Sequence, residues 1–153
     1  MNTLKHTFFW ILLLAFTVTA CNDDNDDLSV VSNGEYNVGL SILGGYSRYV
    51  SIYTGANSGN ESSVAFKPQK DGVVKEMEIK VSKNTLSENG KVVLRKNGSD
   101  AIVQDIGSGT TGYLVSANSV PLNPDDEINL FIDASNREQG ELELTIRVVV
   151  EYP

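Results

Sequence analysis

The side chains that could do chemistry are few in this 153-residue chain, which has one histidine, His6, and one cysteine, Cys21. Histidine is the commonest general acid–base group, and zinc sites rely on histidine and cysteine. A Ser-His-Asp triad or a zinc centre would therefore need one of these two residues. Ser-Lys chemistry, or a pair of carboxylates as in glycoside hydrolysis, is the remaining enzymatic option.

The first residues have the pattern of a secretory signal. Lys5 and His6 precede an apolar run that ends at Ala20 and is shorter than the roughly 20 apolar residues of a membrane-spanning helix. We predict a helical signal peptide over residues 1–20, with a buried N-terminal helix of the fold as the alternative. Cleavage there would remove the only histidine and the only tryptophan, Trp10.

The cysteine follows directly. Val18-Thr19-Ala20-Cys21 resembles the lipobox of bacterial lipoproteins, with valine where leucine is commoner. The resemblance implies cleavage before Cys21 and attachment of several acyl chains, such as palmitate, to its sulfur and new amino group. Each buried CH₂ contributes about 0.8 kcal/mol, so the anchor would be firm. An ordinary signal peptide with Cys21 near its cleavage site is the alternative.

The acidic stretch NDDNDD comes next, and we predict that residues 21–31 form a flexible tether. Acidic residues after a lipidated cysteine resemble the surface-export signal of lipoproteins in one group of Gram-negative bacteria. The resemblance implies an outer-membrane lipoprotein that faces the cell exterior. The periplasmic face is the alternative.

The charge of the cleaved chain argues against nucleic acid as a partner. Losing residues 1–20 lowers Lys+Arg from 12 to 11 and leaves Asp+Glu at 20, a net charge of 11 − 20 = −9. Binding to a phosphate backbone relies on lysine and arginine. The glycine-rich GSGTTG of residues 107–112 lacks the lysine of a P-loop. We expect no cofactor and no enzymatic activity.

The best candidate binding residues lie in GGYSRYVSIYTG. If Val50 and Ile52 of a strand face the core, Tyr49 and Tyr53 face outward. The candidate ligand-binding residues are Tyr46, Arg48, Tyr49 and Tyr53. Exposed tyrosines suit recognition of a glycan or a protein. A cross-strand aromatic pair that only stabilises the sheet is the alternative.

The acidic turn NPDDE offers carboxylate oxygens of the kind that bind calcium. We favour the simpler interpretation, a solvated turn in which Asp125 or Asp126 accepts backbone N–H hydrogen bonds. We therefore predict no metal site.

Alternating apolar and polar residues predict an all-β domain over residues 32–153. Leu142, Leu144, Ile146, Val148, Val150 and Tyr152 share one face of the last segment. In DGVVKEMEIKVS, Val73, Met77, Ile79 and Val81 are expected to point inward, and Asn97-Gly98 predicts a hairpin. The other candidate strands are YNVGLSIL, RYVSIYTG, SSVAFKP, KVVLRK, AIVQDI, TGYLVSA and DEINLFIDAS. NREQGE is a candidate short helical turn.

The order of these segments resembles a jelly-roll domain of phage tail and fibre proteins, akin to complement-type and tumour-necrosis-factor-like jelly rolls. The resemblance covers about residues 64–152. The matching residues are Pro68, Asp71, Gly72, Leu94, Arg95, Asn97, Gly98, Gly109, Gly112, Val120, Leu122, Asp126 and Ile128. Asp125 departs from it, since the family usually has glycine there. The resemblance implies an antiparallel β-sandwich of eight or nine strands, and in many members a trimer.

The sequence thus predicts a lipid-anchored, non-catalytic binding or adhesion module for a glycan or a protein. A structural subunit that assembles through its jelly roll is the alternative, and a small glycan-active enzyme that uses two carboxylates is a further one.

Overall fold

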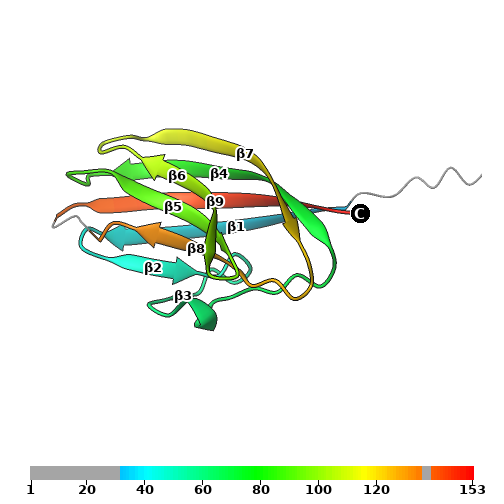
Figure 1. The fold of residues 1–153 in the computed structure, drawn as a ribbon. Helices are drawn as coiled ribbons and strands as arrows, with labels where there is room; N and C mark the ends of the chain where they lie inside the picture. The colour runs from blue at the N-terminus through cyan, green and yellow to red at the C-terminus, as the bar shows by residue number, and fades with distance from the viewer. Residues whose placement is uncertain (1–31, 136–138) are drawn as a thin grey trace, which may run out of the picture.

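The structure is a computed structural model that describes residues 32–135 and 139–153 (Figure 1). Its elements are the strands β1 (Ser32–Leu43), β2 (Ser47–Val50), β3 (Asn57–Ser58), β4 (Gly72–Asn84), β5 (Gly90–Lys96), β6 (Ser99–Ile106), β7 (Gly112–Leu122), β8 (Ile128–Asp133) and β9 (Glu141–Tyr152), with one 3₁₀ turn at Glu61–Ser63. The predicted signal peptide and the tether lie outside the described residues.

The strands form two antiparallel sheets packed face to face (Figure 1). One is four-stranded in the order β1-β9-β4-β7, and the other is five-stranded in the order β3-β2-β8-β5-β6. Without the two-residue β3, the orders 1-9-4-7 and 2-8-5-6 are those of a double Greek key, the jelly roll. The predicted all-β jelly-roll sandwich is confirmed.

The core lies between the sheets, and β9 shows how the sequence builds it. All six apolar residues that alternate along β9, from Leu142 to Tyr152, are buried, as their spacing predicts. β9 is an inner strand, paired with β1 on one side and β4 on the other. Period-two alternation places these side chains on one face because successive Cβ atoms in a strand point to opposite sides.

The inward face of β4 differs from the prediction at one residue. Met77, Ile79 and Val81 are buried as expected, but Val74 is buried in place of Val73. The pairing of β4 with β7 and with β9 shifts between Val74 and Glu76, which marks a β-bulge. A bulge adds a residue and reverses the phase of the alternation beyond it.

One short segment also differs from the prediction, and one predicted hairpin is confirmed. SSVAFKP is not a strand: it begins in the 3₁₀ turn, and only Phe66 forms an isolated bridge, to Ile128. The Asn97-Gly98 hairpin between β5 and β6 is confirmed, with positive φ at both residues (52° and 75°). The candidate turn NREQGE includes residues 136–138, which lie outside the described residues.

No described helix is long and apolar enough to cross a membrane.

Candidate functional site

The four candidate binding residues do not lie on one face of one strand. β2 ends at Val50, because Ser51 starts a turn: its carbonyl accepts from Gly55 N–H at 3.0 Å, and Gly55 has a φ of +71°. Val50 and Ile52 are buried as predicted, but Ser51 is buried as well. Beyond Val50, therefore, strand alternation no longer sets where side chains point.

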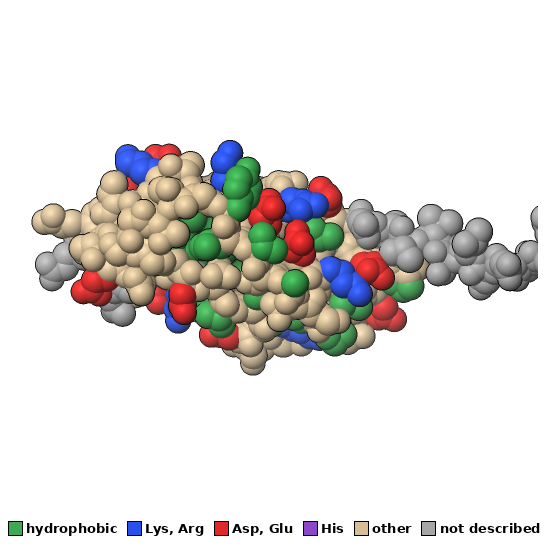
Figure 2. Space-filling model, turned by 90° about the horizontal axis from the view of Figure 1, so that it is seen from above, with side chains coloured by type: hydrophobic (Ala, Val, Ile, Leu, Met, Phe, Trp, Pro, Cys, Tyr) green, Lys and Arg blue, Asp and Glu red, His purple; other side chains and the backbone are tan. Residues whose placement is uncertain are grey.

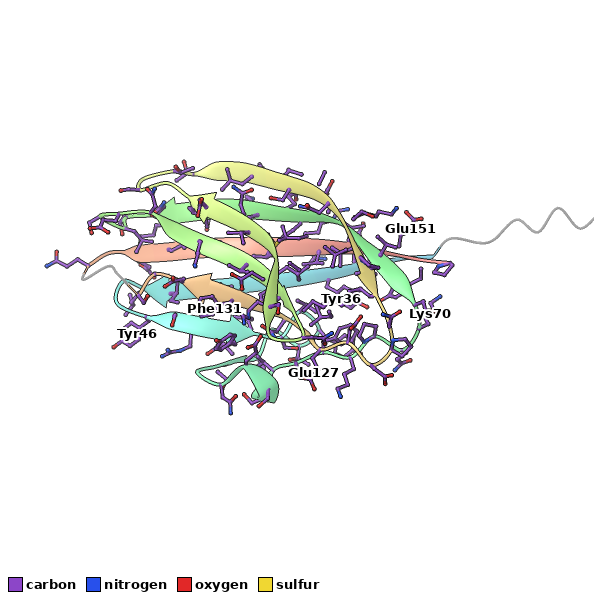
Figure 3. The ribbon with its side chains drawn as sticks, viewed as in Figure 1. Tyr36, Tyr46, Lys70, Glu127, Phe131 and Glu151 are labelled. Atoms are coloured by element: carbon purple, nitrogen blue, oxygen red, sulfur yellow. The ribbon has the colours of Figure 1, made fainter. Side chains whose placement is uncertain are left out.

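Tyr46 and Arg48 line a hollow of about 310 Å³ at the end of the sandwich where Tyr46 lies (Figure 3). The Arg48 guanidinium lies over the Tyr46 ring, 5.2 Å from its centroid. The other lining residues come from the end of β1 and from β3: Leu40, Ser41, Ile42, Leu43 and Asn57. Leu43 and Tyr46 are both exposed.

Tyr49 lies elsewhere, on the outer face of the five-stranded sheet. It pairs with Phe131 across β2 and β8, and the ring centroids are 4.9 Å apart. The Arg95 guanidinium lies 5.9 Å from the Tyr49 ring centroid. This is the cross-strand aromatic pair that the sequence left open as the structural alternative.

Tyr53 belongs to a third site, which we call the aromatic hollow. It measures about 620 Å³ and is lined by Tyr36, Tyr53, Phe66, Gln69, Lys70 and Tyr152. Tyr53 stacks on Phe66, with centroids 5.6 Å apart and ring planes 16° apart, and keeps 70% of its surface exposed. Figure 3 shows Tyr36 and Lys70 far from Tyr46 along the sandwich. The structure therefore separates Tyr53 from Tyr46 and Arg48.

The floor of the aromatic hollow is fixed by close packing. The Tyr36 and Tyr152 hydroxyls are hydrogen-bonded at 2.8 Å. Burial, and then the bond to Tyr152, raises the pKa of Tyr36 well above its ordinary value. A Cβ atom built on Gly34 or Gly72 would come within 2.8 Å of the Tyr152 ring. These glycines therefore leave the space that the ring occupies.

Asp126 holds the acidic turn together. It accepts a backbone N–H hydrogen bond, as predicted, but its side chain is buried rather than solvated. It accepts hydrogen bonds from Asn123 N–H and from Asn97, both at 2.7 Å, and pairs with Lys96 at 2.9 Å. Burial raises the pKa of Asp126, but these donors outweigh it and lower the pKa to about 2. Within the described ranges, no cluster of three His, Cys, Asp or Glu side chains could hold a metal ion.

A polar hollow of about 330 Å³ lies beside that turn, lined by Asn60, Glu61, Ser62, Asn97, Gly98, Glu127 and Asn129. Asn129 is 1% exposed; its amide nitrogen donates to Glu61 at 3.1 Å, and its Oδ1 has no protein partner. Glu61 also accepts from Arg95 Nε at 2.7 Å. Glu61 thus sits in an ion pair that ties the 3₁₀ turn to the sheet.

Three glutamates, Glu35, Glu61 and Glu141, have a lowered pKa because they pair with cationic side chains. Hydrogen bonds from a neighbouring arginine or lysine lower the pKa of Glu35 and Glu141. Burial raises the pKa of Glu61, but cationic and amide donors outweigh it, so this pKa is also lowered. A general acid at neutral pH needs a raised pKa. These carboxylates therefore resemble structural ion pairs more than a glycosidase pair.

The other unusual surface is the outer edge of β7, which we call the β7 edge. β7 is the last strand of its sheet and pairs only with β4. No residue from Gly112 to Pro121 is buried, and Tyr113 and Val115 are 63% and 54% exposed. Residues 106–124 carry no charge, a sequence signal that could have identified this edge. Figure 2 looks onto the molecule from above and shows uncharged side chains and backbone over one half of this face, with hydrophobic side chains beside charged ones near the middle.

The candidate lipidation site, Cys21, lies outside the described residues. Its role therefore stays a prediction from the sequence.

Comparison with known proteins gives a likeness in fold alone. No protein-family model matches the chain, and no curated protein matches it in sequence. A chain in the acidic stable capsid structure of Helicobacter pylori bacteriophage KHP30 is similar, with a TM-score of 0.51 and 14% identity over 81% of this chain and 91% of that one. A chain of the infectious bursal disease virus Gx strain aligns with a TM-score of 0.34 and 9% identity, over 79% of this chain and 32% of that one.

Proposed function

We propose that this protein is a non-catalytic structural subunit that assembles edge to edge with a second copy of itself. We further propose that lipid on Cys21 anchors it to the outer membrane, facing the cell exterior. The observation that carries the assembly role is the β7 edge, which is long, uncharged and paired on one side only.

An open strand edge presents unpaired N–H and C=O groups and is a template for another strand. Proteins that stay monomeric usually guard such an edge with charged residues, a bulge or proline. The outermost strand of the other sheet, β6, carries Asp100 and Asp105. β7 has no charged residue. It carries a bulge between Ala117 and Val120, followed by Pro121, so both of these guards lie near its end and residues 112–117 have none.

Charge also favours the β7 edge as the contact. The cleaved chain has a net charge of 11 − 20 = −9, so most faces of two copies repel each other. β7 itself brings no charged residue to such a contact, and Lys80 of β4 lies 5.8 Å from the Tyr113 ring centroid. The exposed Tyr113 and Val115 side chains add apolar area that association would bury.

Antiparallel pairing of two β7 strands about a two-fold axis would join the two four-stranded sheets into one continuous sheet. Such a contact is isologous and closes as a dimer. It differs from the trimer that the jelly-roll resemblance implies. The likeness to a chain of a phage capsid, itself an assembly, is compatible with a structural role but shows only the fold.

Light scattering on residues 32–153 across a range of concentrations tests the proposal. We expect the mass to rise from monomer to dimer. A monomer at every concentration would exclude self-assembly, and a trimer would keep assembly but exclude β7 pairing.

A binding or adhesion module is the second candidate function. The aromatic hollow favours it, because its lining and volume suit a small ligand.

A further inference from the structure

We propose that the aromatic hollow binds a sugar ring of a glycan. This inference goes beyond self-assembly and does not depend on it, because the hollow shares no lining residue with the β7 edge. The hollow combines an aromatic wall, a fixed floor and several polar groups, and each part matches one feature of a sugar.

The aromatic wall matches the apolar face of the sugar. Tyr53 offers a ring that is 70% exposed, and Phe66 stacks on that ring from within the protein. Phe66 is itself packed against Tyr36, with ring centroids 5.3 Å apart. The wall is therefore preformed, and a ligand that stacks on it loses little free energy to ordering the site.

The polar groups match the hydroxyls of the sugar. When one hydroxyl of the Tyr36–Tyr152 pair donates to the other, the second keeps its own hydrogen to donate. A tyrosine hydroxyl is already protonated at neutral pH, and burial raises the pKa of Tyr36 further. Gln69 offers both an amide donor and an acceptor, and Lys70 is a donor that lies 5.0 Å from the Tyr152 ring centroid. The hollow thus offers both hydrogen-bond donors and acceptors. A sugar hydroxyl can pair with both kinds, because it donates and accepts at once.

The lining also argues against other small ligands. No carboxylate is among the described residues of the hollow, so a metal ion would find no strong ligand there. A purely apolar ligand would cover Gln69 and the tyrosine hydroxyls without replacing their hydrogen bonds to water, which costs free energy. The volume of about 620 Å³ lies within the range of small-molecule sites.

The test begins with the full-length chain in a detergent that has no sugar headgroup. The protein is applied to an array of neutral and uronic-acid-containing oligosaccharides. The oligosaccharide that binds most strongly is then titrated into the protein by calorimetry. We expect Tyr53→Ala to weaken binding about tenfold, the upper end for an aromatic contact. Gln69→Ala should weaken it several-fold through a lost hydrogen bond. Val103→Ala is the control, because Val103 is an exposed apolar residue on β6, outside both the hollow and the β7 edge, and it should leave the affinity unchanged.

Two results would overturn the proposal: no oligosaccharide on the array binds, or the bound one keeps its affinity in both Tyr53→Ala and Gln69→Ala. If no oligosaccharide binds and Tyr53→Ala also lowers the mass of the assembly, the hollow is instead a contact between copies. The dimer mass is measured without glycan, so either proposal can fail while the other stands.

Discussion

The two edges of the four-stranded sheet, β1 and β7, are built differently. Side chains of β1 bond to its own neighbour β9: Glu35 accepts from Arg147 and Ser41 donates to Glu141, both at 2.7 Å. β7 has no charged side chain, and its Ser116 donates to Gln104 on β6, in the other sheet. β1 also buries Val38 and Ile42, whereas β7 buries none of its residues before Leu122. Both strands are unpaired on their outer side, but β1 carries the charged Glu35 and β7 carries no charge, so the proposed partner is expected at β7.

The largest expected effect on stability comes from Leu122, the one β7 residue whose side chain is buried. Leu122 is 1% exposed, so Leu122→Ala should lower the free energy of unfolding by about 2–5 kcal/mol through lost burial and the cavity it leaves. Chemical denaturation of residues 32–153 measures it. A loss below about 1 kcal/mol would show that β7 contributes little to the core even where it is buried.

Asp126 fixes the turn at the end of β7, and Asp126→Ala should cost about 1–3 kcal/mol because Asn97 and Asn123 N–H lose a charged acceptor. Its folded pKa of about 2 lies below the ordinary 3.8. The stabilisation by ionised Asp126 is therefore complete above about pH 4 and is lost as the pH falls toward 2. Urea denaturation between pH 5 and 2 should show this decline in the wild type, and a smaller decline in Asp126→Asn. Equal slopes would contradict this role of Asp126.

Val115→Lys places a charge on the β7 edge and should weaken self-association at least tenfold, about 1.4 kcal/mol, because two copies would bring like charges together. The readout is the dimer dissociation constant by light scattering. Val103→Lys on β6 is the matched control, since Val103 is 52% exposed and Val115 is 54% exposed. Equal weakening by both variants would remove the distinction between the edges.

The smallest effect is expected on the β1 side. Arg147 pairs with Glu35 and Glu76 at the surface, so Arg147→Ala should lower the free energy of unfolding only slightly, and less at high salt. Its dimer mass should equal that of the wild type. A change in mass would place the contact on the β1 half of the sheet instead.

Long alternation made most of the fold predictable. β9 alternates throughout except at Val149, and each apolar residue expected inward is buried. The bulge in β4 was not predictable, because Val73 and Val74 are both apolar and only pairing with β7 and β9 decides between them. The segment after Val50 was misjudged because an alternating pattern continues into a turn, where hydrogen bonds at Ser51 set the backbone.

The sites were less predictable. The sequence identified Tyr53, but Tyr36 and Tyr152, which join it in the aromatic hollow, lie far away along the chain. The jelly-roll pairing of β1 with β9 brings them together, Ser32 lying opposite Tyr152. Tyr46 and Tyr49 are near Tyr53 in sequence, yet they line a different hollow and a different face. Closeness in sequence therefore gave the wrong grouping.

The most direct test of the central claim is amide hydrogen exchange along β7 and β1 at low and high protein concentration. Pairing of two β7 edges would protect outward N–H groups of residues 112–120 as the concentration rises, while the β1 amides would exchange at an unchanged rate. The account would be contradicted if β7 exchange stayed independent of concentration, or if protection rose on β1 instead.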